Sequence, residues 1–261
     1  MDELPIELIH YILYEPVIKL NWTTVIKCIK TSKVFQVLNK REVCVLANVS
    51  EGYEHCIEKG NLNALQRCIK KEDIQNSFNL SCKYDQLTLA QWIIEYAKSI
   101  GTTIDIQDND IINFIWCCYN NNLKFVQWYI KYANSIGTSI DIHVDNEEAF
   151  IISCDNGYLK LAQWLIEYSA SIGSPIDIHI KNELAFISSC YNGHLEIAQW
   201  LIEYGDSINS PINIHISNEG AYRHSHLNEY FKITEWLIQT YDGFDTTRFN
   251  ASQLAFYNAH K

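Results

Sequence analysis

Long apolar runs and prolines are scarce in this sequence of 261 residues. No apolar run approaches the ~20 residues that a helix needs to cross a bilayer, and no signal-peptide pattern stands at the start. Four prolines beside 48% hydrophobic residues fit neither a collagen-like nor a disordered chain. These absences predict a folded protein of the cytosol or nucleus that does not enter a membrane.

Basic charge is also in short supply, since the formal net charge is −11. Residues 1–72 hold ten Lys/Arg against nine Asp/Glu, whereas residues 73–261 hold 10 against 22, a net −12. So acidic a stretch repels phosphate backbones, which disfavours nucleic acid as a partner. Residues 16–41 carry six basic side chains and no acidic one, either as a patch for an acidic partner or as an ordinary solvated face.

Recognisable catalytic and metal-binding motifs are missing as well. The sequence has no Gly-rich phosphate loop, nucleophile elbow or paired set of carboxylates. Cys117-Cys118 does not form a C-x-x-C motif, and His224-x-His226 lacks a third ligand nearby. We therefore expect no enzymatic activity, no cofactor and no metal.

What the chain does contain is a repeat. Five of its seven tryptophans recur every 36 residues, each in a variant of A-Q-W-L-I-E-Y: Trp92, Trp128, Trp164, Trp200 and Trp236. A fixed period of this length indicates a repeat array rather than one globular core. The tryptophans are interpreted as a buried structural ladder, with an exposed recognition strip as the alternative.

Other columns follow the same period. Four of the nine cysteines form one (Cys82, Cys118, Cys154, Cys190), which predicts reduced thiols packed in the interior. Each unit has a first helix with an aromatic residue (Phe78, Phe114, Phe150, Phe186, Tyr222) and a second helix with the tryptophan. Gly101, Gly137 and Gly173, with Asn209 in the fourth copy, predict one repeated backbone geometry with positive φ.

Each inter-unit loop ends in I-D-I-H or a variant, from Ile104, Ile140, Ile176 and Ile212. The alternation predicts a short extended hairpin arm. Its histidines (His143, His179, His215) lie too far apart to share a metal, because packed repeats are spaced by ~8–10 Å. We expect them to bond the backbone of the next loop.

At residues 192–202, N-G-H-L-E-I-A-Q-W-L-I resembles the second half of an ankyrin repeat, and residues 182–190 take the place of its T-P-L-H segment. The 36-residue period exceeds the usual ~33 and is most similar to the divergent repeats of giant, mimivirus-like DNA viruses. The resemblance covers roughly 50–257. It implies a concave protein-binding surface of arms and first helices, on which an acidic line could select a basic partner: Asp105, Asp141, Asp177 and Asn213. Ordinary solvated loop carboxylates are the alternative.

The opening residues predict helices of their own, with one apolar stripe along Leu8, Ile9 and Ile12 and a proline at the first helical position. Leu4-Pro5-x-Glu7-Leu8, Ile12, Cys28, Ser32-Lys33, Phe35 and Leu38 together resemble an F-box. That resemblance implies docking to a Skp-type adaptor of a cullin ubiquitin ligase. The implied adaptor contacts are Leu4, Pro5, Leu8, Ile9, Ile12, Phe35 and Leu38.

The expected fold is all-α, an ankyrin-repeat solenoid of helix-turn-helix units with short hairpin loops, preceded by a small helical F-box-like unit. The F-box-like unit spans 1–42 and the array 43–261, with a short first pair at 51–72, five units over about 73–250 and a capping helix at 251–261. The expected function is a viral substrate receptor in the host cell cytoplasm that links a bound target to the ligase. The alternative is a stand-alone ankyrin binding protein whose N-terminal helices cap the array.

Overall fold

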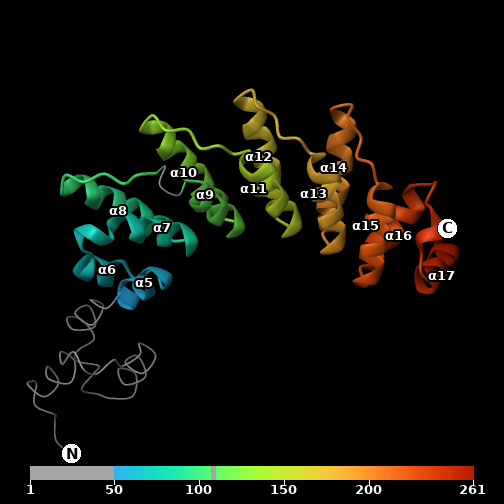
Figure 1. The fold of residues 1–261 in the computed structure, drawn as a ribbon, viewed down its shortest axis with the longest axis horizontal. Helices are drawn as coiled ribbons and strands as arrows, with labels where there is room; N and C mark the ends of the chain where they lie inside the picture. Colours follow the sequence, from blue (N-terminus) through green and yellow to red (C-terminus); the bar gives the residue numbers. More distant parts are fainter. Residues whose placement is uncertain (1–49, 107–109) are drawn as a thin grey trace, which may run out of the picture. The chain divides into compact units, whose positions relative to one another are not determined.

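The computed structural model describes residues 50–106 and 110–261, and the helices are labelled in Figure 1. The predicted F-box-like unit, residues 1–42, lies outside the described residues. The chain divides into two compact units, 1–108 and 109–261. In the described part of both units the regular structure is entirely helical.

In unit 1, α5 (Ser50–Glu58) and α6 (Leu62–Cys68) form a short pair. The 3₁₀ turn Lys71–Asp73 leads into α7 (Ile74–Lys83), and α8 (Leu87–Ser99) completes a longer pair. α5 packs on α7 as well as on α6. The first helices of neighbouring pairs are therefore in direct contact within this unit.

Unit 2 continues the same pattern. Its first helices are α9 (Asp110–Tyr119), α11 (Val144–Asp155), α13 (Ile180–Tyr191) and α15 (Ile216–Leu227). Its second helices are α10 (Leu123–Ser135), α12 (Leu159–Ser171), α14 (Leu195–Ser207) and α16 (Phe231–Thr240). The 3₁₀ turn Thr246–Arg248 and α17 (Ala251–His260) close the chain.

Successive first helices of unit 2 pack directly on one another, and each also packs on its own second helix. Successive second helices do not approach as closely among the described residues. The row of pairs therefore bends toward its first helices, as the arc from α9 to α15 in Figure 1 shows.

The interior is built from the columns that the sequence repeats. The first-helix aromatics Phe78, Phe114, Phe150, Phe186 and Tyr222 have no exposed surface, and the same holds for Cys82, Cys118, Cys154 and Cys190. These cysteines are free, as predicted, and burial raises the pKa of the thiols of Cys118, Cys154 and Cys190. The predicted cysteine column is thus confirmed as a small apolar filler of the core.

The loops confirm one prediction and correct another. Gly101, Gly137, Gly173 and Asn209 all have positive φ, from 54° to 80°, so one geometry does recur. The arms, however, are not β-hairpins, since no strand occurs in residues 50–106 or 110–261. The alternation of buried isoleucine and exposed polar residue is present, but side chains rather than a neighbouring strand receive the arm's backbone N–H groups.

Candidate protein-binding face

The acidic line predicted from the sequence lies on the arms. In each arm two isoleucines are buried on either side of one exposed residue, which is Asp105, Asp141, Asp177 or Asn213. The buried isoleucines fix each arm against its helix pair, because their burial is the main favourable term available to so short a loop. The polar side chain between them is thereby held on the surface.

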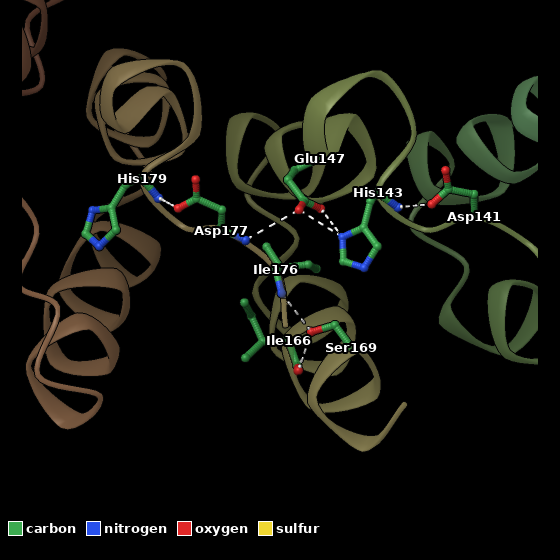
Figure 2. A network of polar contacts seen from close by, with 8 residues as sticks. All are labelled: Asp141, His143, Glu147, Ile166, Ser169, Ile176, Asp177 and His179. Carbon is green, nitrogen blue, oxygen red and sulfur yellow. Dashed lines mark hydrogen bonds and ion pairs between the residues drawn. The ribbon is translucent and has the colours of Figure 1, made fainter. Parts of the chain in front are cut away.

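These exposed side chains also have a structural task. Asp141 Oδ1 accepts a hydrogen bond of 2.9 Å from the backbone N–H of His143, and Asp177 Oδ1 accepts one of 2.9 Å from His179 (Figure 2). Asn213 Oδ1 does the same for His215 at 3.1 Å. One oxygen of each carboxylate closes the local turn, and in Figure 2 the other points away from it.

The histidine column behaves differently from the prediction. His143 Nδ1 lies 2.8 Å from Glu147 Oε1 in the same unit, and it is this glutamate that accepts the backbone N–H of Asp177 in the next arm, at 3.4 Å (Figure 2). The predicted bond from histidine to the next backbone was therefore wrong. The histidine instead orients a carboxylate, and an oxygen of that carboxylate accepts the backbone N–H of the next arm.

We call this arrangement the relay: a histidine orients a buried glutamate, and the glutamate accepts a backbone N–H of the next arm. It repeats along unit 2. His179 Nδ1 is 2.9 Å from Glu183 Oε1, which accepts from Asn213 N–H at 3.2 Å. The next copy pairs His215 with Glu219, which accepts from Asp245 N–H at 3.0 Å. Glu147, Glu183 and Glu219 are only 7%, 5% and 3% exposed. Buried carboxylates require such partners, since each would otherwise lose its hydration without compensation.

In unit 1 an uncharged glutamine takes the place of the relay glutamate, and in α9 of unit 2 an isoleucine does. Gln75 Oε1 accepts the N–H of Asp105 at 2.8 Å, and Gln75 Nε2 donates to Asp105 O at 2.9 Å. The equivalent position in α9 is Ile111, whose side chain has no acceptor atom. The arm at 140–143 is therefore not held by this type of contact.

The glutamates reach the next arm from an unusual backbone. Lys181, Asn182 and Glu183 have φ of 51°, 58° and 58°, and the same three positions at 145–147 and 217–219 are also left-handed. Each such residue costs roughly 1–2 kcal/mol. The relay contacts of Glu147, Glu183 and Glu219 with the next arm are made from this backbone. No glycine occupies these positions, and asparagine, which tolerates this geometry, holds the middle one in each copy (Asn146, Asn182, Asn218).

A serine hydroxyl secures one arm to its own second helix. The buried hydroxyl of Ser169 donates to Ile166 O at 2.8 Å and accepts from the N–H of Ile176 at 3.2 Å (Figure 2). The arm is thus hydrogen-bonded on one side to α12 and on the other to α11. Asp177 consequently has a fixed position on the surface.

Large apolar side chains are exposed on the first helices, which the sequence reasoning did not single out. Ile112 is 53% exposed, Tyr119 50%, Tyr191 46% and Leu227 65%. Ile112 and Tyr119 lie seven residues apart, on one side of α9. These side chains could have been recognised in the sequence, because they are apolar residues at positions that are polar in an amphipathic helix.

The tryptophan column is intermediate between its two interpretations. All five indoles are half-buried. Trp92, Trp128, Trp164 and Trp200 stack on the tyrosine four residues later, with ring centroids 5.0–5.9 Å apart, while Trp236 meets Tyr241 edge to face. Trp200 also contacts Phe150 of the preceding pair, so this ring helps to fill the space between α14 and the first helix α11.

In the described residues, no group of three or more His, Cys, Asp and Glu is arranged to hold a metal ion. Within the same residues, no helix combines the length and the apolar character needed to span a bilayer.

Comparison with known protein families identifies ankyrin repeats, in three copies, over residues 114–212. No curated protein matches the chain. The helix-turn-helix pairs described above have the architecture of an ankyrin solenoid, so the predicted fold class is confirmed. Ankyrin repeats are protein–protein interaction modules and are generally non-catalytic.

Proposed function

We propose that this chain is a non-catalytic target receptor. In this proposal the face formed by the first helices and the arms binds a target protein, and residues 1–42 dock a Skp-type adaptor of a cullin ubiquitin ligase. The place of action is the cytoplasm, which is the host cytoplasm if the chain is viral, as its resemblance to giant-virus repeats suggests.

One observation carries the target-binding half: exposed apolar side chains and exposed carboxylates occur together on neighbouring elements. Tyr191 and Leu227 project from adjoining first helices, and Asp177 lies on the arm that leads into α13. Interfaces use this combination, with apolar anchors in the centre and polar groups at the rim. The first helices and arms therefore suit a protein target better than a small ligand.

The charge of this face favours a basic target. Asp141 and Asp177 each keep one oxygen outside the local turn, Asp105 is exposed on its arm, and residues 73–261 carry a net −12. An arginine or lysine beside each carboxylate would add electrostatic complementarity, which mainly raises the association rate and the specificity. Asn213, the neutral member of the line, would accept a hydrogen bond without requiring a charge.

The adaptor-binding half is supported by the F-box resemblance of Leu4, Pro5, Leu8, Ile9, Ile12, Phe35 and Leu38. Forty residues are at the lower limit for a domain that folds alone. An apolar stripe on so small a unit calls for a partner, either the adaptor or the array itself.

A pull-down with a purified Skp-type adaptor tests this half. We expect the wild-type full-length chain to retain the adaptor and a Leu8→Asp/Ile12→Asp variant to lose it, because two carboxylates would enter an apolar contact. A Gln36→Asp/Asn39→Asp variant adds the same charge at polar positions and should bind as the wild type does. Equal retention by all three chains would favour the stand-alone binding protein, with the N-terminal helices as a cap.

A further inference from the structure

Three of the four second helices of unit 2, α10, α12 and α14, form a row (Figure 1). The fourth, α16, is not part of it, because its Trp236 meets Tyr241 edge to face and has no stacked tyrosine four residues later. Each helix of the row carries its stacked tryptophan and tyrosine and ends at an exposed isoleucine. Ile136, Ile172 and Ile208 are 44%, 50% and 46% exposed. In each helix the tryptophan, the tyrosine and the isoleucine follow one another at intervals of four residues, so they lie along one flank of that helix. A repeated apolar flank of this kind marks a surface for contact with another macromolecule.

Charged side chains beside this flank change sign along the row. The positions four residues before and three residues after each tryptophan are its neighbours on the helix surface. These positions, all exposed, hold Lys124 and Lys131 in α10, Lys160 and Glu167 in α12, and Glu196 and Glu203 in α14. The row therefore runs from basic through neutral to acidic, and Asp206 adds a further negative charge to α14.

Within the described part of unit 2, the ion pairs lie elsewhere, on the arms and first helices. The charges of the row thus face the solvent. A surface whose two ends carry opposite charges is complementary to a reversed copy of itself, which is the requirement for an isologous interface.

We propose that a second copy of this chain covers the row, in a two-fold dimer whose axis runs along α12. Rotation about that axis reverses the order of the helices, so α10 of each copy faces α14 of the other. Lys124 and Lys131 then meet the glutamates of the second copy. The residues of α12, Ile172 as well as Lys160 and Glu167, lie near their own counterparts, so α12 contributes apolar contact and the attraction between charges comes from α10 and α14. An axis across the row would instead place α10 on α10, with lysine against lysine.

The dimer is expected to be small and reversible. Unit 2 bends toward its first helices, so close contact on the second-helix side is concentrated around α12. The lysines and glutamates at the two ends act at a somewhat greater distance. At physiological ionic strength the Debye length is about 8 Å. Salt therefore screens the repulsion between the net charges of the two chains, which acts over longer distances, far more than the attraction between these facing groups.

Charge reversal gives a direct test by sedimentation of the full chain at increasing concentration. Variant A carries Lys124→Glu/Lys131→Glu and variant B carries Glu196→Lys/Glu203→Lys. Either variant alone should dimerise at least ~10-fold more weakly than the wild type, because each brings like charges together twice. An equimolar mixture of A and B should regain dimers, since α10 of A is then complementary to α14 of B and the reverse also holds.

A matched control, Lys70→Glu/Lys71→Glu, makes the same change in net charge in unit 1 and should dimerise as the wild type does. A wild-type chain that stays monomeric up to about 100 µM would overturn the proposal. So would dimers that tolerate A and B, or a mixture that remains monomeric. The dimer leaves the first helices and arms uncovered, so its failure would leave the proposed target-binding function unaffected.

Discussion

A buried carboxylate needs hydrogen-bond donors in place of water, and this requirement on single residues explains the relay between neighbouring repeats. Glu183 is almost fully buried, and it receives both the imidazole of His179 and the backbone N–H of Asn213. The histidine supplies a donor within the unit, and the backbone of the next arm supplies the other. The glutamate thus couples one repeat to the next, and His179 adds a second link, since its Nε2 lies 2.7 Å from Ser210 Oγ in the same loop.

Replacing Glu183 by alanine should lower the free energy of unfolding by about 1–3 kcal/mol, because the N–H of Asn213 and the ring of His179 would lose their acceptor. Urea unfolding followed by circular dichroism measures this change. Glu183→Gln is the matched control, since Gln75 makes the corresponding contact in unit 1 at 2.8 Å. The glutamine variant should lose less than the alanine variant. An alanine variant as stable as the wild type would refute the relay.

His226 provides a pH-dependent prediction. It stands in the cysteine column, is buried, and its Nε2 lies 3.1 Å from Ser252 Oγ of α17. Burial lowers its pKa below the ordinary 6.5. The unfolded chain therefore binds the proton at higher pH, so the stability that His226 contributes is complete above about pH 6.5 and is lost as pH falls through its lowered pKa.

We expect the wild-type chain to lose more stability between about pH 7 and pH 5 than a His226→Cys variant, which restores the residue of the other repeats. Thermal unfolding of both chains over this range gives the comparison. The other histidines are present in both chains, so their contribution to the pH dependence of stability cancels in the comparison. Parallel pH profiles would show that His226 does not titrate in the folded protein as its burial implies.

At the scale of elements, two kinds of loop impose different demands on glycine. Gly173 follows α12 with φ of 74°, and a Cβ there would meet no atom within 4 Å. Gly193, between α13 and α14, has φ of 85°, and its Cβ would come within 2.6 Å of the ring of Tyr230. The first site requires only a left-handed backbone, whereas the second also requires the absence of a side chain.

Gly173→Asn should therefore change the stability by less than about 0.5 kcal/mol, because asparagine tolerates this geometry and Asn209 already occupies the equivalent position at φ of 54°. Gly193→Ala should cost at least about 2 kcal/mol, since strain and steric conflict add. Denaturant midpoints of the two variants measure the difference. A reversed order would contradict the geometry of both loops.

The repeated columns predicted the helices, the buried aromatics and cysteines, and the positive φ after the second helices, because each depends on residue type at a fixed spacing. The left-handed turn before each relay glutamate was not predicted. Lys181 and Ser217 at its first position do not favour positive φ, and the available signal was the asparagine at its middle position in every copy (Asn146, Asn182, Asn218). The role of the histidines was mistaken because the acceptor, Glu147 or its equivalent, is recognised only once the next arm is in place.

On the scale of the whole molecule, the assignment of the acidic line stays a prediction. Asp141 and Asp177 are exposed, yet each also closes its own turn, so its presence in every unit has a structural reason as well. Tyr191 keeps 46% of its surface exposed although its ring meets that of His224 in the next first helix at 5.5 Å, and Leu227 is 65% exposed. They are therefore the better positions from which to ask which face a partner occupies.

The decisive measurement is photo-crosslinking in cells, with a photo-reactive side chain placed at Tyr191, and separately at Glu167 on α12, of the full-length chain. If the first helices and arms bind the target, position 191 should give adducts with a different protein. Position 167 should give none with that protein and should instead join two copies of this chain. Adducts with the same foreign protein from position 167 but not from 191 would show that the target binds the second helices.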